Sequence, residues 1–246
     1  MTHLCSLAPF TGYLLRSARA GGQLEQSVHR PRREFLLVRH GEAYCNVHGR
    51  LASEACHGLT DRGRWQADRL ADRLAAEQNV GYPITALFAS TVRRALDTAA
   101  PIAGMLGIPT TVRRELRVPD PGPSGEGEPW QTLHRKWPPD PDQPSRPVLP
   151  GAERWRDYLG RAHACLATIL RDHPGGRVVV IGHSETATAL ITLLAGISTL
   201  RALRVDLDHT GITRLIATPE YPYVRIPFQR WSLAIHNDTS HLETTT

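Results

Sequence analysis

Residues 35–42 read FLLVRHGE, and this short stretch decides the fold class of the chain. The apolar run Phe35 to Val38 is typical of a strand buried inside a sheet. The charged and flexible sequence from Arg39 to Glu42 follows at once, so the strand is expected over residues 35–39 and to end in a polar turn. A buried strand followed directly by polar residues favours an α/β protein.

The order of apolar run, turn-rich loop and helical pattern recurs along the chain, as in α/β proteins. Helices are expected at residues 61–78 (capped by Thr60), 92–106 (ended by Gly107), 153–173 and 186–194. Strands are expected at residues 84–88, 110–112, 177–181, 203–207 and 213–217, with an edge strand at 228–235. We therefore predict a three-layer α/β/α sandwich with a mostly parallel central sheet.

Two stretches depart from this pattern. Residues 119–150 hold ten of the 19 prolines, which excludes regular structure over most of them, so we interpret them as an insertion or lid. Residues 1–33 are rich in arginine but lack the apolar core of a secretory signal, and we interpret them as a flexible tail. Residues 34–246 are expected to form a single domain, because a chain of 246 residues suits one large α/β domain.

Composition excludes several classes of protein. No apolar run approaches the roughly 18–20 residues of a membrane span, so no membrane association is expected. Residues 1–33 carry +4 of the net charge of +5, because they contain five arginines and a single acidic residue, Glu25. The remainder of the chain shows no basic stripe for binding nucleic acid. The four cysteines (Cys5, Cys45, Cys56 and Cys165) have no zinc or disulfide spacing. We expect a cytoplasmic protein without metal or cofactor, and a homodimer stays open.

Polar motifs follow three of the predicted strands. Arg39 and His40 come after the first strand, Ser90 and Arg94 after the second, and His183 after residues 177–181. Ligands of open α/β sheets bind outside the carboxyl ends of the strands, so these side chains are expected to line one pocket. Arginine forks match phosphate oxygens, and a neutral imidazole is a good nucleophile. The sequence therefore predicts a site for a phosphoryl group.

These motifs resemble the signature of the histidine phosphatase superfamily, the phosphoglycerate-mutase-like fold. The resemblance spans about residues 35–217 and covers four motifs in order. They are Arg39-His40-Gly41-Glu42 with Asn46; Leu59-Thr60, Gly63 and Gln66-Ala67 (LTxxGxxQA); Ser90, Arg94-Ala95 and Thr98-Ala99 (SxxxRAxxTA); and Gly182-His183.

The resemblance implies metal-independent hydrolysis of a small phosphorylated substrate. His40 would attack phosphorus and become a transient phosphohistidine. Arg39, Arg94 and His183 would clamp the phosphoryl oxygens. The resemblance also implies substrate contacts from Asn46, with Glu42 orienting the pocket, and Ser184 is expected among the substrate-binding residues.

One position departs from the family pattern. The family's general acid commonly lies in an LxE segment, but here Leu116-Arg117 is followed by Val118. A leaving alkoxide needs a proton, so another acid must serve. Asp120 and Glu185 are the two candidates, and we favour Glu185 because it follows a strand end; Asp120 serves equally as a turn former, and Glu185 as a helix-start carboxylate.

Other functions remain as alternatives. A phosphate-binding protein that has lost catalysis, or a biosynthetic enzyme that does not hydrolyse its substrate, could use the same pocket. Residues 182–186 also approximate the GxSxG turn of α/β-hydrolases, with Ser184 as nucleophile, Asp206 or Asp208, and His209 or His236. Thr186 replaces the last glycine of that motif, which counts against it. Mutase activity is disfavoured because residues 119–150 do not resemble the mutase insertion.

Overall fold

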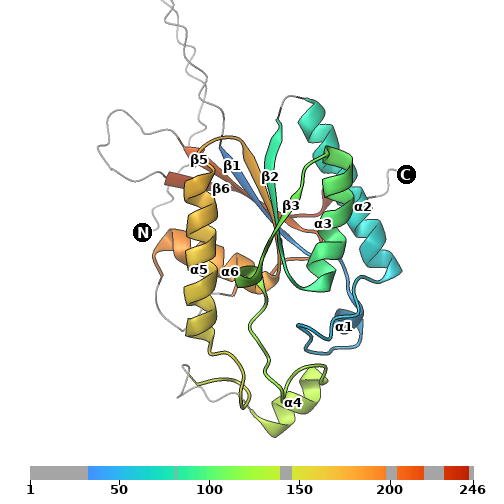
Figure 1. Cartoon of the computed structure of the whole chain (residues 1–246), viewed down its shortest axis with the longest axis vertical. Coiled ribbons are helices and arrows are strands. Elements are labelled where there is room, and N and C mark those ends of the chain that lie inside the picture. The colour runs from blue at the N-terminus through green and yellow to red at the C-terminus, as the bar shows by residue number, and fades with distance from the viewer. Residues whose placement is uncertain (1–32, 81, 139–145, 198–203, 219–229, 244–246) are drawn as a thin grey trace, which may run out of the picture.

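The computed structural model describes residues 33–80, 82–138, 146–197, 204–218 and 230–243 (Figure 1). Their centre is a sheet of six strands in the order β3-β2-β4-β1-β5-β6. The strands are β1 (Glu34–Arg39), β2 (Ile84–Ser90), β3 (Thr110–Arg113), β4 (Arg177–Gly182), β5 (Ile212–Thr218) and β6 (Arg230–Asp238). Strands β3, β2, β4 and β1 run parallel, whereas β5 and β6 add antiparallel pairs. The predicted mostly parallel sheet is confirmed.

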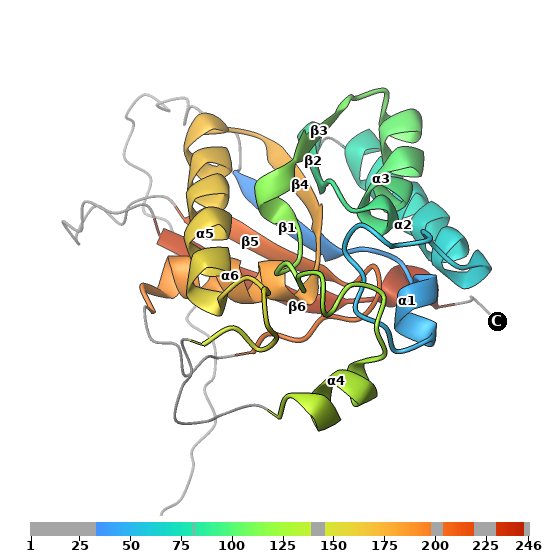
Figure 2. The same cartoon turned by 60° about the horizontal axis from the view of Figure 1, so that its bottom comes forward.

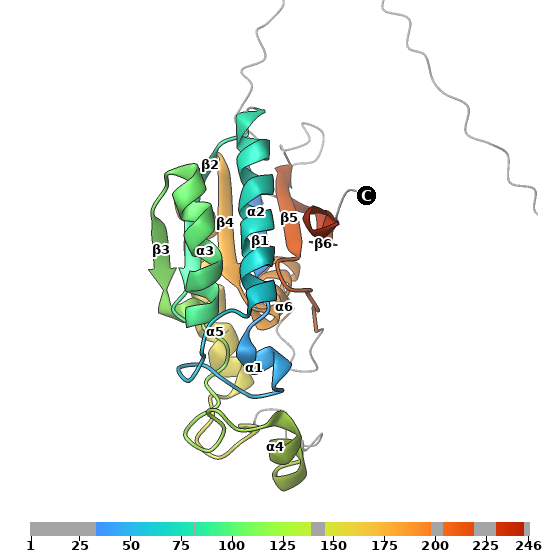
Figure 3. The ribbon, with the colours of Figure 1, turned by 90° about the vertical axis from the view of Figure 1, so that its right-hand side faces the viewer.

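Helices cover both faces of the sheet, as the three-layer prediction requires (Figures 1 and 3). They are α1 (Tyr44–Val47), α2 (Asp61–Asn79), α3 (Arg93–Leu106), α4 (Trp130–Lys136), α5 (Trp155–Asp172) and α6 (Ser184–Ala195). Alternate residues of β1 face opposite layers: Leu36 and Val38 pack with α2 and α3, whereas Phe35 and Leu37 pack with α5 and α6. This double burial explains why the strand reads as an unbroken apolar run.

Helix boundaries follow from local chemistry. Thr60 caps α2, because its Oγ1 accepts a hydrogen bond from the Gly63 amide at 3.0 Å. Gly107 ends α3 in the left-handed conformation (φ 66°), which glycine adopts without steric cost. Helix α6 begins at Ser184, two residues earlier than predicted, so Ser184 and Glu185 occupy its first turn.

The strand expected at residues 203–207 is wrong over its described part, because residues 204–207 belong to no strand. Val205 and Leu207 are buried as alternate residues of a strand would be. However, the Val205 amide donates to Thr188 Oγ1 at 3.0 Å instead of to a neighbouring strand. Burial alternates in the same way in both arrangements, so the sequence pattern does not separate them.

Several expectations fall partly outside the described residues, namely the tail up to residue 32, part of the insertion (139–145), residue 203 and the first two residues of the predicted edge strand. The described part of the insertion is irregular except for α4. Arg33 packs on the domain, with its guanidinium carbon 4.9 Å from the centre of the Trp231 ring. The edge strand is confirmed as β6, which extends to Asp238.

The parallel strands deliver their polar motifs to one edge. Arg39 pairs in register with Gly182, and Ala89 with Ile181, so β1, β2 and β4 end at the same level. Residues that follow these strands therefore meet at that edge, which we call the carboxyl edge. Helices α1 and α4 lie beyond this edge (Figure 2).

Candidate active site

Three side chains from different strand ends meet at the carboxyl edge. The rings of His40 and His183 have centroids 5.2 Å apart in an edge-to-face arrangement. Arg94 lies against both: its Nε donates to His40 Nε2 at 2.9 Å, and its Nη2 lies 3.4 Å from His183 Nδ1. All three are buried, with exposed fractions of 3%, 1% and 5% for His40, His183 and Arg94. The predicted convergence of these residues is therefore present.

The turn that carries His40 is fixed by contacts of its backbone. The Gly41 amide donates to Thr98 Oγ1 at 3.0 Å, and the Glu42 amide donates to Gln66 Oε1 at 2.8 Å. A Cβ on Gly41 would lie 2.6 Å from the Gly63 carbonyl oxygen, so a side chain has no room there. Thr98 and Gln66 belong to the motifs of the sequence, and the structure shows that they hold this turn.

Arg39 is held by the segment that precedes β5. Its Nη1 donates to the Leu207 carbonyl at 2.5 Å, and it lines the same pocket as His40 and Arg94. Within the described part of the chain, neither Arg39 nor Arg94 forms a salt bridge; Arg94 Nη1 instead donates to the Ala52 carbonyl at 2.7 Å. Two guanidinium groups thus share one pocket without a salt bridge to a described carboxylate, which is a setting for an anion.

The hydrogen bonds of His40 define its tautomer. Nδ1 lies 2.7 Å from the Gly41 carbonyl oxygen, which can only accept, so Nδ1 carries the proton. Nε2 accepts from Arg94 and therefore presents its lone pair on that side. Burial lowers the pKa of His40 well below its usual value, and Arg94 and His183 lower it further by charge repulsion. The imidazole is neutral near pH 7, as a nucleophile must be.

His183 is held in a similar neutral state. Its Nε2 lies 3.0 Å from Ser90 Oγ, and its amide donates to Thr186 Oγ1 at 3.1 Å. Burial lowers its pKa well below the usual value, and Arg94 and Arg39 add to the effect. Ser90, the first residue of a sequence motif, thus orients the second histidine.

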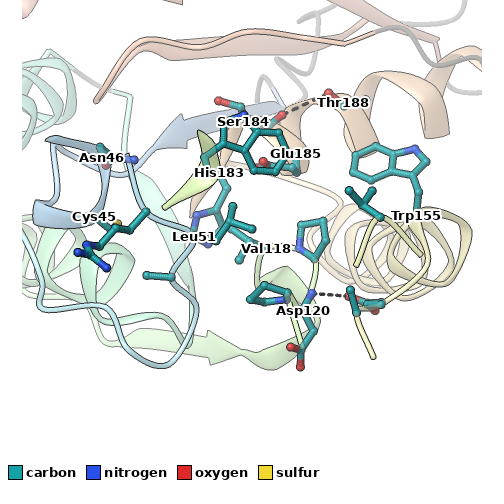
Figure 4. A pocket seen from close by; sticks show the side chains of 18 of the residues that line it. Cys45, Asn46, Leu51, Val118, Asp120, Trp155, His183, Ser184, Glu185 and Thr188 are labelled. Atoms are coloured by element: carbon teal, nitrogen blue, oxygen red, sulfur yellow. Dashed lines mark hydrogen bonds between the residues drawn. The ribbon is translucent and has the colours of Figure 1, made fainter. Parts of the chain in front are cut away.

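The pocket in front of these residues has a volume of about 630 Å³. Figure 4 shows Cys45 and Asn46 on one side, Trp155 on the other, and His183 between them. Of the expected substrate-binding residues, Asn46 and Ser184 line the pocket, and Glu42 does not. Glu42 instead accepts a hydrogen bond from Thr60 Oγ1 at 2.8 Å, which joins the turn after His40 to the start of α2.

Both candidate acids line the pocket, in different surroundings. Asp120 is exposed, its Oδ1 accepts from the Gly122 amide at 2.9 Å, and its carboxylate points away from His183 in Figure 4. Glu185 is half-buried in the first turn of α6, forms no hydrogen bond with the described residues, and is attracted by the charge of Arg39. Val118 lies in the wall between them, where it offers no proton. This geometry favours Glu185.

The outer wall of the pocket comes from the insertion. Its backbone pairs with the loop after α1: the Leu51 amide donates to the Glu128 carbonyl at 3.0 Å, and the Gly127 amide donates to the Leu51 carbonyl at 2.7 Å. The Glu126 carboxylate also accepts from the backbone amide of Ser53, at 2.8 Å. The insertion and this loop therefore form one continuous wall.

Several contributors to the site carry no signal in the sequence. The Ala52 and Leu207 carbonyls bind the two arginines through backbone atoms, which any residue offers. Cys45 lines the pocket with its Sγ 3.8 Å from Arg94 Nη1. The ring of His209 lies 5.8 Å from that of His40, and burial lowers its pKa to about 4.

The alternative serine nucleophile lacks its partners. Neither His209 nor His236 hydrogen-bonds with Ser184, and His236 Nδ1 instead lies 3.1 Å from Thr213 Oγ1. Within the described residues, no group of three or more metal-ligating side chains gathers, and none of the helices is long and apolar enough to span a membrane.

Comparison with known proteins agrees with this geometry. The model of the histidine phosphatase superfamily (branch 1) matches residues 35–227. The chain is 28% identical over 220 residues to a protein named probable phosphoglycerate mutase GpmB of Salmonella typhi, covering 86% of this chain and 95% of that one. Bacillus stearothermophilus YhfR superposes with a TM-score of 0.69 at 25% identity, covering 86% of this chain and all of the other. A mycobacterial glucosyl-3-phosphoglycerate phosphatase in complex with VO3 superposes with a TM-score of 0.65 at 22% identity, covering 83% and 98%.

Proposed function

Because this chain belongs to the histidine phosphatase superfamily, we propose that it hydrolyses phosphate monoesters through a transient phosphohistidine on His40. The observation that carries this proposal is the neutral His40 imidazole, whose Nε2 lone pair faces Arg94 in a pocket with two guanidinium groups that form no salt bridge with a described residue. A phosphoryl group that binds the arginines places its phosphorus beside that lone pair.

The first step transfers the phosphoryl group to the enzyme. Nε2 of His40 forms a bond to phosphorus while the bond from phosphorus to the leaving oxygen breaks. Glu185 is the general acid that gives a proton to the leaving oxygen. The proton of His40 stays on Nδ1, which donates to the Gly41 carbonyl, and this hydrogen bond stabilises the positive charge that develops on the ring.

The second step returns the enzyme to its starting state. The Glu185 carboxylate takes a proton from water, and the resulting hydroxide attacks phosphorus as the bond to Nε2 breaks. Inorganic phosphate leaves, and His40 is neutral again. Arg39, Arg94 and His183 bind the equatorial oxygens in both steps, where charge increases in the transition state. Asn46 and Ser184 contact the substrate at the pocket wall.

The first experiment tests the nucleophile. Wild type should turn over p-nitrophenyl phosphate, and His40→Ala should lose at least roughly 10⁴-fold in kcat. The matched control is His48→Ala, an exposed histidine near the end of α1 that does not line the pocket and should keep its activity. Acid quench with labelled substrate should give label on the His40 peptide. Label on Ser184, or full activity in His40→Ala, would overturn the mechanism, and phosphate binding without turnover would support the non-catalytic alternative.

The second experiment separates the two acids by the leaving group. Glu185→Gln should reduce kcat roughly 10²-fold or more with an alkyl phosphate but far less with p-nitrophenyl phosphate, whose leaving group needs little protonation. Asp120→Asn should change both substrates equally and slightly. If Asp120→Asn shows the selective loss, the acid is Asp120.

Hydrolysis is favoured over the mutase reaction that the name of the Salmonella relative suggests. Beyond Arg39 and Arg94, the described pocket lining offers two cationic side chains, Arg50 and Arg204. Arg50 Nη1 donates to the Gly127 carbonyl and Arg204 Nε to Asp206, each at 2.7 Å. Each already has a partner among the described residues, which disfavours a role in binding the carboxylate of a phosphoglycerate. The three cysteines of the described residues are free thiols, which suits a reducing compartment such as the cytoplasm.

A further inference from the structure

Two buried thiols face each other beside the phosphate site. Cys45 lies in α1, and Cys56 lies in the segment that returns towards α2. An antiparallel bridge between Ala43 and Leu59 holds the two arms of this loop together, and the Tyr44 amide donates to the Gly58 carbonyl at 3.2 Å. Both cysteines are free and buried, and they pack in one cluster with Ala43, Ala52 and Leu59.

Arg94 connects this pair to the chemistry of the site. Its Nη1 lies 3.8 Å from Cys45 Sγ, and the same nitrogen donates to the carbonyl of Ala52, which lies in the loop between the two cysteines. The neighbouring Cys45 lowers the pKa of the Cys56 thiol; burial opposes this, and the Arg94 charge adds to it. The pKa of the Cys45 thiol is raised in turn by Cys56 and by burial, so Cys56 is the thiol that ionises. A thiol pair beside a fixed cation is a setting in which one thiolate forms readily.

We propose that Cys45 and Cys56 are an oxidation site, at which a peroxide joins them in a reversible disulfide that disables the phosphate pocket. The loss of activity rests on the proposed phosphatase function, whereas the disulfide itself does not. The Cys56 thiolate attacks a peroxide oxygen, which gives a sulfenic acid and, for hydrogen peroxide, water. Cys45 then attacks the sulfenic sulfur as its thiol loses the proton, and a second water is released, so two thiols are oxidised and one peroxide is reduced.

The geometry gives the oxidant access and gives the disulfide its effect. Cys45 lines the pocket, so a small peroxide that enters by the route of the substrate arrives beside the thiol pair. Bond formation brings the two sulfurs to about 2.05 Å and forces the loop to follow. That loop carries the Ala52 carbonyl that fixes Arg94, together with the pocket residues Asn46 and Leu51. Arg94 therefore loses both its sulfur and its carbonyl contact at the catalytic position.

The test uses the full chain with Cys5→Ser and Cys165→Ser, so that only the two loop thiols remain. After treatment with hydrogen peroxide, intact mass should show the loss of two hydrogen atoms, and neither thiol should react with an alkylating agent after unfolding. Turnover of p-nitrophenyl phosphate should fall roughly 100-fold, because small misplacements of a binding group cost about that much. Dithiothreitol should restore both the mass and the rate.

Controls separate the pair from other thiol chemistry. Adding Cys56→Ser should abolish the mass change and the reversible inactivation, each measured against the untreated variant. In the wild-type chain, Cys165 on α5 should remain reduced, because burial raises its pKa to about 11. Two alkylated thiols after peroxide, a sulfinic acid on one cysteine, or a disulfide without a change in rate would each overturn the proposal. If the enzyme shows no turnover, the mass result still tests the disulfide, and calorimetric binding of inorganic phosphate before and after oxidation tests its effect on the pocket.

Discussion

The two ends of the sheet carry arginine clusters with opposite surroundings. At the start of β4, Arg177 Nε lies 3.1 Å from Glu34, and Arg214 on β5 lies 2.8 Å from Glu77. Arg177 is only 2% exposed and has both carboxylates as partners. Burial would raise the pKa of Glu77, but Arg214 and Arg177 outweigh this and lower it. We call this end the amino edge.

At the carboxyl edge, Arg39 and Arg94 contact imidazole, sulfur and carbonyl groups, and neither forms a salt bridge with a described residue. An arginine with buried carboxylates is already compensated and holds structure together. An arginine without them keeps its charge available for an anion. The comparison therefore separates a structural cluster from a functional one, although both consist of buried or half-buried guanidinium groups at the ends of one sheet.

The largest effect is expected at the amino edge. Arg177→Met removes the contact between Arg177 and the buried Glu34 carboxylate and leaves the longer contact to Arg214 in place, so unfolding free energy should fall by about 3–5 kcal/mol. Urea denaturation measures this loss, and kcat/KM of the folded fraction should stay unchanged. Arg171→Met, at an exposed position on α5, should leave stability unaltered. The double variant Glu34→Leu/Arg177→Met should recover part of the lost unfolding free energy. A loss of activity without destabilisation in Arg177→Met would contradict the structural role of this cluster.

The matching change at the carboxyl edge should act on activity. Arg94→Ala should lower kcat/KM roughly 10²–10³-fold by removing a donor to the phosphoryl group, with stability equal to wild type or higher because an uncompensated buried charge is gone. Steady-state kinetics and urea denaturation give the two readouts. The neighbouring Arg93→Ala is the control, since Arg93 is exposed and pairs only with Asp97 at 3.7 Å. Equal losses of activity in both variants would contradict the assignment.

Acid should weaken the carboxyl edge before the amino edge. His40 and His183 have pKa values lowered well below 6.5, so the unfolded chain binds their protons first and stability falls as pH drops below about 6.5. Each contributes about 1.4 kcal/mol per pH unit until its folded pKa is reached. The lowered pKa of Glu77 acts only below about pH 4.5, where the unfolded carboxyl takes up its proton.

Urea denaturation at pH 7.5 and 5.5 in a phosphate-free buffer tests this order. Stability should fall between these values, and His40→Gln should reduce the slope by about one proton. A slope unchanged by that substitution would show that His40 is not held neutral in the folded state.

The smallest effect is expected at Thr60, which lies at the carboxyl edge but serves structure. Thr60→Ala removes the cap of α2 and the hydrogen bond to Glu42, so unfolding free energy should fall by about 1 kcal/mol. Catalytic rates should change less than about threefold, because Thr60 does not line the pocket. Thr60→Ser keeps the hydroxyl and should retain most of the stability. A large fall in rate would place Thr60 in the functional cluster.

Much of this arrangement could be predicted because strand ends are visible in the sequence. The apolar run before Arg39 and the run before Gly182 mark two buried strands, and the polar residues after them had to meet at one edge if the strands were parallel. The spacing from Ser90 in the SxxxRA motif also selects Arg94 over the adjacent Arg93. These inferences rest on the periodicity and spacing of side-chain types, which can be read directly from the sequence.

The features that were missed depend on tertiary contacts of the backbone. Val205 and Leu207 alternate as strand residues do, yet their segment pairs with Thr188 and Arg39 instead of with a strand. The carbonyls that fix the two arginines are common to every residue type, so no motif marks them. The proximity of Cys45 and Cys56 likewise follows from the bridge that closes their loop, which their spacing in the chain does not reveal.

The wall formed by the insertion is joined to the loop after α1 largely through backbone amides and carbonyls, as the Leu51, Gly127 and Glu128 contacts show. Such contacts survive almost any exchange of side chains. Selection can therefore alter the residues that meet the leaving group while the machinery on the strand ends stays the same. A new substrate preference is therefore expected to need substitutions in the insertion and in the loop after α1, and none in the sheet.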